Sequence, residues 1–211
     1  MCTLNSGGVI TNEREKMRTI YTQDWSTEQH GWTAAASCAK APSVPTRINV
    51  AHPLAEYAIM FAGNGGWAIA AKEPPLTSGV LEIGFRAYVC SSGRNSLSLN
   101  VRDKRGGAIF KFSFGERGAI LANRQPRPTG EDQPSITTLR YTCHRPYELI
   151  ARHVIGSRKF TLTLLDLITG EFSEDQTVWA CSSSTPPSML DFDQEGSGAV
   201  AYLGKVEVVE P

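Results

Sequence analysis

The segment 147–172, YELIARHVIGSRKFTLTLLDLITGEF, restricts the fold more than any other part of the chain. A helix would bury Gly156 in its middle and expose several leucines. Two strands joined by a turn at Gly156–Ser157 instead give the second strand one purely apolar face, made of Phe160, Leu162 and Leu164. Alternation with a period of two residues is typical of a strand with one buried face. The segment therefore predicts a β-hairpin whose apolar face belongs to a core.

Three further segments alternate in the same way: GVLEIGFRAYVC from Gly79, SLSLNVRDKRGG from Ser96 and AIFKFSFGERG from Ala108. Their predicted inward-facing residues are Leu81, Ile83, Phe85, Ala87, Val89, Leu97, Leu99, Val101, Phe110, Phe112 and Phe114. Turns rich in Gly, Pro, Asn and Ser separate these and other short strands, and no segment sustains a helical period. The chain is predicted to be all-β, folded as an antiparallel sandwich or barrel.

The length of 211 residues lies at the upper end of what one all-β domain holds, and it allows a core that needs no disulfides. Residues 1–20 are polar and mixed, and are predicted to be an N-terminal extension. Residues 21–211 are predicted to form a single domain. The Pro-rich segment near Pro126 is the only candidate linker, and a division there would leave each half too few strands to close a sandwich.

Charge and hydropathy exclude some function classes. Lys plus Arg and Asp plus Glu are each 21, so the formal net charge is zero. General nucleic-acid binding needs a positive field and is not expected, although a local basic patch is compatible with this balance. No apolar run approaches the ~18 residues of a membrane-spanning helix. The N-terminus lacks the apolar region of a signal peptide, so we expect a cytoplasmic chain or a secreted one whose leader has been removed. No sequence feature indicates the oligomeric state.

The five cysteines are odd in number and widely spaced, and no Cys/His cluster predicts zinc. Most are expected to be buried free thiols, since free cysteine packs as a small apolar residue. One disulfide, for instance between Cys143 and Cys181, stays compatible with a secreted protein.

The order of features along the chain resembles that of a known family. An acidic-aromatic turn, QDWSTEQHGW, comes first, followed by the strand LEIGFRAYV and the run SLSLNVRDKRGGAIFKFSFGERGAI. The segment YELIAR then pairs with KFTLTLLDLITGEF. The last segment is LDFDQEGSGAVAYLGKVEVVE. From about Tyr21 to Glu210 this resembles the concanavalin A-like, or laminin-G-like, jelly-roll family. The resemblance implies a two-sheet antiparallel β-sandwich. Its members include carbohydrate-binding modules, lectins, glycoside hydrolases and polysaccharide lyases, so it indicates the fold better than the function.

The catalytic motifs of that family are incomplete in this chain. Its hydrolases place carboxylates along one face of a strand, as in Glu-x-Asp-x-x-Glu. Here DFDQE has Asp191, Asp193 and Glu195 at i, i+2 and i+4, but GSG follows at once. We interpret this segment as a strand end or loop, which disfavours a hydrolase. The alginate-lyase motifs Arg-x-Glu-x-Arg, Gln-x-His and Tyr-x-Lys-x-Gly-x-Tyr are not present intact.

The outward residues of the predicted strands are rich in basic and aromatic side chains. If neighbouring strands share one concave sheet, a groove forms from Glu82, Arg86, Tyr88, Asn100, Arg102, Lys111, Arg140, His144 and Arg152. Trp67, in the glycine-rich GNGGWA, is predicted to be exposed enough to stack on a sugar. Arginine suits carboxylate or sulfate groups, and aromatic faces suit sugar rings. This groove predicts non-catalytic binding of a glycan or polysaccharide, for instance an anionic one.

Three alternatives stay open. A polysaccharide lyase needs cations or amides beside a proton-transferring Tyr or His, and Tyr88, His144, Arg86 and Asn100 are the right residue types. A protein-interaction module like the laminin-G domains is the second alternative. The third is that these residues are ordinary solvated positions with charge pairs across strands, and a register shift of one residue would turn each side chain to the other face.

A calcium ion is the only cofactor that the sequence suggests. DFDQEGSG begins like an EF-hand loop, but Tyr202 stands where the bidentate Glu is needed, so an EF-hand is rejected. The family resemblance implies a structural calcium between an acidic N-terminal turn and the last strands. Asp24, Asp191 and Asp193 are its candidate ligands, and solvated carboxylates at turns are the alternative. The predicted binding function requires no cofactor.

Overall fold

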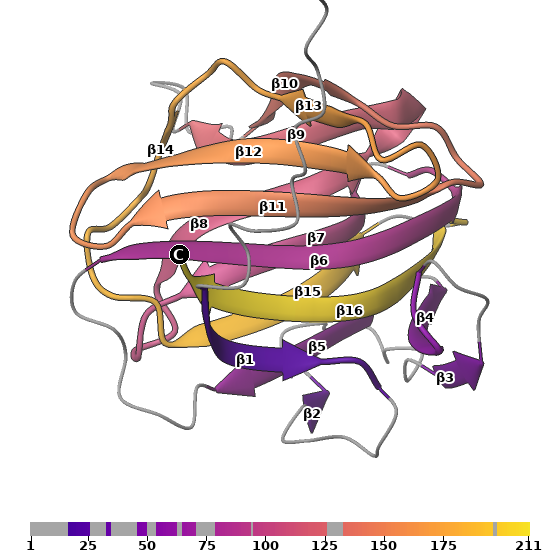
Figure 1. The fold of residues 1–211 in the computed structure, drawn as a ribbon, viewed down its shortest axis with the longest axis horizontal. Coiled ribbons are helices and arrows are strands. Elements are labelled where there is room, and N and C mark those ends of the chain that lie inside the picture. The colour runs from indigo at the N-terminus through magenta and orange to yellow at the C-terminus, as the bar shows by residue number, and fades with distance from the viewer. Residues whose placement is uncertain are drawn as a thin grey trace, which may run out of the picture.

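A computed structural model describes residues 17–25, 33–34, 46–49, 54–62, 65–70, 79–93, 95–125, 133–195 and 198–211. Its strands form two antiparallel sheets packed face to face, which confirms the predicted all-β sandwich (Figure 1). Sheet A has nine strands: β13 (Phe172–Glu174), β12 (Lys159–Asp166), β11 (Pro146–Val154), β6 (Val80–Ser91), β16 (Val200–Glu210), β4 (Tyr57–Ala62) and β3 (Thr46–Asn49) in spatial order, with β1 (Arg18–Gln23) also on β16 and β14 (Trp179–Ala180) also on β12.

Sheet B has seven strands and lies behind sheet A in Figure 1. Their spatial order is β10 (Gln133–Arg140), β9 (Ala119–Gln125), β8 (Ala108–Gly115), β7 (Asn95–Arg102), β15 (Met189–Glu195), β5 (Gly65–Ala70) and β2 (Thr33–Ala34). A 3-10 turn, η3 (Glu116–Gly118), connects β8 to β9. Strands β7, β8 and β15 occupy the middle of this sheet, so their outward side chains lie far from both of its edges.

The core lies between the two sheets, where the predicted inward residues meet. All of the alternating apolar residues predicted in β6, β7 and β8 are buried. Phe85 of sheet A lies in the middle of this core, with ring centroids 5.7, 5.8 and 5.2 Å from those of Phe112, Phe114 and Phe192 of sheet B. Tilted and edge-on ring contacts of this kind add to the stabilisation from apolar burial. The packing fixes which side chains of each strand must point outward.

The predicted hairpin is present as β11 and β12. Its register runs from Tyr147 opposite Asp166 to His153 opposite Phe160. Gly156 in the connecting turn has φ of +86°, a left-handed conformation that glycine adopts without strain. β11 also pairs with β6, so the hairpin is attached to the centre of sheet A.

Two expectations about strands are corrected. The segment DFDQE was expected to be a strand end or loop, but Asp191–Glu195 lies inside β15, between β7 and β5. The consecutive strands β6 and β7 were expected to share a sheet, but they belong to opposite sheets. β1 begins at Arg18, inside the segment predicted to be an extension, and pairs with β16; the division into extension and domain remains a prediction.

Cys90, Cys143 and Cys181 are free thiols, so the disulfide considered between Cys143 and Cys181 is not formed. Cys181 is buried, with its Sγ 3.7 Å from Nδ1 of the buried His153. Cys2 and Cys38 lie outside the described residues. Within the described part of the chain, no helix has the length and apolar character needed to cross a membrane.

Candidate functional site

The predicted groove residues are divided between two outer faces of the sandwich. Sheet A carries Glu82, Arg86 and Tyr88 on β6, and Arg152 on β11. The middle of sheet B carries three of the residues that were expected beside them: Asn100, Arg102 and Lys111. The chain crosses from one sheet to the other between β6 and β7, so the assumption of one shared concave sheet does not hold. The binding role of these residues stays a prediction.

Three predicted residues occupy other positions: Arg140, His144 and Trp67. Arg140 is exposed on β10, the edge strand of sheet B, and its guanidinium donates to the carbonyls of Thr137 and Leu139. His144 is exposed in the turn before β11, with φ of +65°. Trp67 falls in β5, and its side chain lies outside the described part of the structure.

A network of polar side chains covers the middle of the outer face of sheet B. The amide nitrogen of Asn100 donates to Asp191 Oδ1, and also to Asp193 Oδ2 at 3.1 Å. Arg102 Nε donates to Asp191 Oδ2, and Lys111 Nζ donates to the two oxygens of Asp193 at 3.2 and 3.1 Å. We call these five residues the sheet B network. They form two ion pairs, and one amide joins the pairs.

Strand register explains why these residues meet. Asp191 lies opposite Asn100, and Asn100 lies opposite Lys111, so their side chains share one face across β15, β7 and β8. The intervening residues, such as Phe192, point into the core and fix that orientation. On the other side of β15, β5 places Gly66 opposite Asp193. Glycine has no side chain, so nothing projects over Asp193 from that position.

The network is only partly exposed to solvent. The side chain of Asp191 is 11% exposed, and that of Lys111 is 20% exposed. Burial raises the pKa of Asp191 above the usual value for an aspartate, although Arg102 and Asn100 act to lower it. Arg102, Lys111 and Asp193 retain partial access to solvent, whereas Asn100 and Asp191 are buried. The side chains hold one another in place, as expected of a preorganised surface.

The outer face of sheet A carries separate ion pairs. Arg86 Nε lies 3.2 Å from Glu148 Oε2, and Arg152 Nε lies 3.8 Å from Glu82 Oε1. Both pairs join directly opposed residues of β6 and β11. The structure thus contains the cross-strand charge pairing that the sequence left open as an alternative for these positions.

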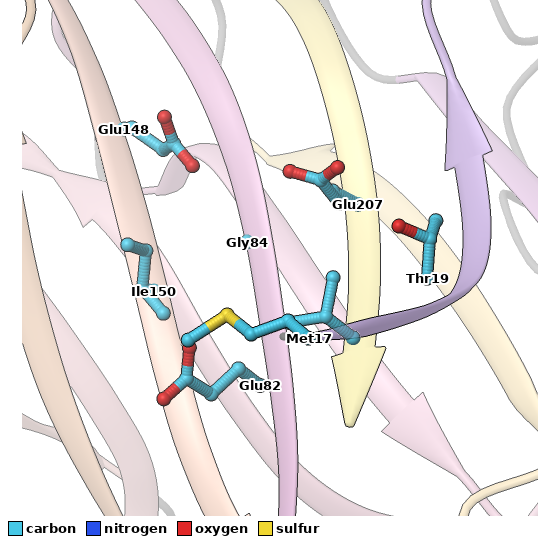
Figure 2. A pocket seen from close by; sticks show the side chains of 8 residues that line it. Met17, Thr19, Glu82, Gly84, Glu148, Ile150 and Glu207 are labelled. Atoms are coloured by element: carbon cyan, nitrogen blue, oxygen red, sulfur yellow. The ribbon is translucent and has the colours of Figure 1, made fainter. Parts of the chain in front are cut away.

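A pocket lies beside these pairs (Figure 2). Glu148 and Glu207 stand on either side of Gly84, and Met17 extends across the strand beside Glu82. Its volume is about 90 Å³, well below the roughly 300 Å³ at which small-molecule pockets begin. In the described ranges, no three His, Cys, Asp or Glu side chains gather so as to hold a metal ion. The small volume of this pocket therefore does not indicate a sugar site. Its described carboxylates are not grouped closely enough to indicate a metal site.

An aromatic cluster lies at one end of the same face. The ring centroid of Tyr88 is 6.2 Å from that of His144 and 6.1 Å from that of Tyr202, and both contacts are edge-on. Tyr88 and Tyr202 are half-buried. Asn100, the fourth residue of the predicted lyase set, lies on sheet B. The structure therefore brings Tyr88 and His144 together and leaves Asn100 on the opposite outer face.

The predicted calcium ligands have other partners. Asp191 and Asp193 accept hydrogen bonds from Asn100 and from two cationic side chains. A calcium ion bound there would have to displace Arg102 and Lys111, so these two carboxylates do not fit the ion in this arrangement. Asp24 is exposed directly after β1. The structural calcium stays a prediction.

Sequence reasoning did not group Asp191 and Asp193 with the basic residues of sheet B. The signal was present in SMLDFD, where Leu190 and Phe192 alternate with the two aspartates. The glycines that follow hid it, because they suggested that the strand ended early. Ser98 and Ser113, buried on the same face, were also missed because a serine in a strand carries no strong signal of its own.

Comparisons with known proteins establish the fold. No protein-family model matches the sequence, and no curated protein matches it. Among solved structures, the chain is similar to the exoplasmic/lumenal domain of VIP36 in its Ca²⁺/Man3GlcNAc-bound form, with 10% identity and a TM-score of 0.60 over 92% of this chain and 90% of that one. It is also similar to the CBM2 module of the evolved Dit of Lactobacillus casei BL23 phage J-1, with 11% identity and a TM-score of 0.56 over 92% and 96%.

A third similar structure is a sialidase, with 10% identity and a TM-score of 0.59 over 84% of this chain. This chain spans only 17% of the sialidase chain, so the match concerns one part of that enzyme. At such identities the similarities show the fold alone: a two-sheet β-sandwich.

Proposed function

We propose that this protein binds a carbohydrate through the sheet B network: Asn100, Arg102, Lys111, Asp191 and Asp193. The observation that carries the proposal is that one amide, two cations and two carboxylates from three adjacent strands are linked by hydrogen bonds at the middle of a sheet face. Sugar hydroxyls both donate and accept, and so match a surface of closely spaced donors and acceptors. Because the side chains already hold each other in place, binding would order few additional groups.

The structural neighbours support this proposal. The VIP36 domain was solved with a mannose-containing glycan, and the phage Dit domain is a CBM2 module. We further propose, on the order of strands and turns, that this β-sandwich belongs with the concanavalin A-like family rather than with unrelated sandwiches.

A glycan array followed by calorimetry tests the proposal. We expect the protein to bind at least one saccharide, and Arg102→Ala to weaken that binding by about tenfold or more through loss of one charge-assisted contact. Arg152→Ala is the matched control. Arg152 lies on sheet A, with its Nε 3.8 Å from Glu82, so this variant should leave the affinity unchanged. If both variants lose the same affinity for the saccharide, or if only Arg152→Ala loses affinity, the sheet B network is excluded as the site.

A glycoside hydrolase is the second candidate, and one observation favours it. Asn100 donates to an oxygen of each aspartate, so those two oxygens lie within two hydrogen-bond lengths, at most about 6 Å apart. Paired carboxylates at short separation suit hydrolysis through a covalent intermediate. Burial raises the pKa of Asp191, as a general acid requires. Release of reducing ends from an array hit, abolished by Asp193→Asn, would replace the binding proposal with this one.

A further inference from the structure

We infer that the sheet B network selects neutral, hydroxyl-rich saccharides over anionic ones; this inference rests on the proposed function. The sequence alone suggested the opposite preference, because it grouped Arg102 and Lys111 with the arginines of other strands into one basic groove. The structure separates those arginines from the network and places two carboxylates beside the two cations. The class of ligand follows from that local charge balance.

The formal charge of the network is zero. Arg102 is paired with Asp191, and Lys111 with Asp193. A sugar carboxylate could reach either cation only by competing with the aspartate already bound to it. Breaking one of these pairs would leave a partly buried aspartate without its cation and close to the incoming negative charge. Both effects oppose binding of an anion, since like charges repel strongly where solvent is partly excluded.

Neutral hydroxyl groups meet no such opposition. An ionised carboxylate offers about four lone-pair sites. The described contacts of Asp191 come from Asn100 and Arg102, and those of Asp193 from Asn100 and Lys111. Further acceptor capacity remains for sugar O–H donors, and hydrogen bonds to charged acceptors are about twice as strong as neutral ones. A uronate carboxylate has no proton to donate to these oxygens, whereas a primary hydroxyl at the same carbon has one.

Ser98 adds a polar but uncharged group beneath the network. It lies opposite Asp193 on the same sheet face, and its side chain is fully buried. Among the described residues, its hydroxyl has no hydrogen-bond partner. Buried polar groups are nearly always paired, so an unpaired hydroxyl beneath the network is consistent with a partner supplied by bound water or ligand. A hydroxyl can donate and accept, and therefore suits a neutral polar group and adds no positive charge.

The test compares saccharides that differ only in charge. Glucose, mannose and galactose oligomers are titrated by calorimetry against glucuronate, mannuronate and galacturonate oligomers of equal length. We expect the wild-type protein to bind at least one neutral oligomer about tenfold or more tightly than its uronate counterpart. The affinity for the preferred neutral oligomer should change little between low salt and about 0.5 M NaCl, because no net charge is neutralised on binding.

Asp193→Asn removes one carboxylate and releases Lys111. We expect this variant to lose affinity for the neutral oligomer and to gain about tenfold or more for the uronate. Glu207→Gln is the control, since it makes the same change of charge at the pocket of sheet A. Thermal melts verify that both variants fold. If Asp193→Asn does not fold, the salt series on the wild-type protein tests the preference for neutral saccharides.

Tighter binding of the uronate by the wild-type protein, weakened by salt and by Arg102→Ala, would overturn this inference and leave the proposed function intact. Absence of binding to any of the oligomers and to the wider glycan array would overturn the proposed function, and this inference with it. A neutral preference that Asp193→Asn reverses, and that Glu207→Gln leaves unchanged, would support both.

Discussion

At the scale of single residues, Arg102 is the network side chain whose removal we expect to cost most stability. Its partner Asp191 lies in a desolvated position, so Arg102→Ala would leave a mostly buried carboxylate without its cation and with Asn100 as its described donor. We expect a loss of about 1–3 kcal/mol in the free energy of unfolding, measured by urea denaturation. Arg152→Ala should cost less than about 1 kcal/mol, because the Arg152 side chain is exposed and its Nε lies 3.8 Å from Glu82. Equal costs would contradict the ranking.

The buried hydroxyl of Ser98 gives a prediction of opposite sign. Removing a buried polar group that has no partner removes a desolvation penalty, so Ser98→Ala should leave the unfolding free energy unchanged or raise it by up to about 1 kcal/mol. Affinity for the saccharide should fall in the same variant. A stability loss above about 1 kcal/mol would mean that the hydroxyl is satisfied in the free protein.

Asp175 gives the protein a defined sensitivity to acid. Burial alone would raise the pKa of Asp175, but hydrogen bonds from Trp179, Thr138 and Thr177 outweigh it and lower the pKa below the usual value. A lowered pKa in the folded state means that the ionised carboxylate stabilises the fold. This stabilisation is complete above the unfolded-state pKa of about 4 and is lost as the pH falls through the lower, folded-state pKa.

Asp175→Asn should therefore be less stable than the wild-type protein near neutral pH by about 1–3 kcal/mol, since a neutral amide accepts hydrogen bonds through one oxygen only. The difference should shrink as the pH falls from about 4, where Asp175 protonates in the unfolded chain, through the lower folded-state pKa. Urea titrations between pH 7 and pH 2.5 measure it. A difference that stays constant over this range would show that ionisation of Asp175 does not contribute.

At the scale of elements, turn geometry produces a prediction at Gly118. This residue ends η3 with φ of +74°, and a Cβ atom there would collide with the backbone carbonyl of Tyr141. Gly118→Ala should cost about 3 kcal/mol or more, because the backbone of η3 and the segment that follows β10 must both move. Gly170 is the control: its φ is +75° with open space around it, so Gly170→Ala should cost only about 1 kcal/mol. Similar melting temperatures for the two variants would contradict this account.

Strands and their buried faces were largely predictable from the sequence, because alternation is a local property. β6, β7, β8 and the β11–β12 hairpin have the predicted inward residues. The partition of strands between sheets was not predictable in the same way. β6 and β7 follow each other in the chain but separate, whereas β15 inserts between β7 and β5 from far along the sequence. Such pairings depend on tertiary packing, which no local pattern encodes.

The candidate site shows the same limit. Asn100, Arg102 and Lys111 were identified because they alternate with core residues in strongly patterned strands. Their carboxylate partners come from β15, whose short alternation ends at glycines. The charge of the site, and so its expected ligand, changed once Asp191 and Asp193 were placed beside the two cations. Side chains from distant strands thus decided the chemistry of residues that the sequence had already indicated.

At the scale of the whole molecule, the sandwich has two outer faces of different character. Sheet B carries a linked, partly buried polar network at its centre. Sheet A carries cross-strand ion pairs, a small acidic pocket and an aromatic cluster near one end. We propose that saccharides bind to sheet B, whereas the described charges of β6 and β11 on sheet A pair across strands.

Backbone amide chemical shifts during titration with a saccharide identified on the array test this assignment most directly. We predict that the largest chemical-shift changes fall on β7, β8 and β15, around Asn100, Lys111 and Asp191. Arg102→Ala should abolish these changes. Largest shifts on β6, β11 and β16, around Tyr88, Glu148 and Tyr202, would place the ligand on sheet A and contradict the account.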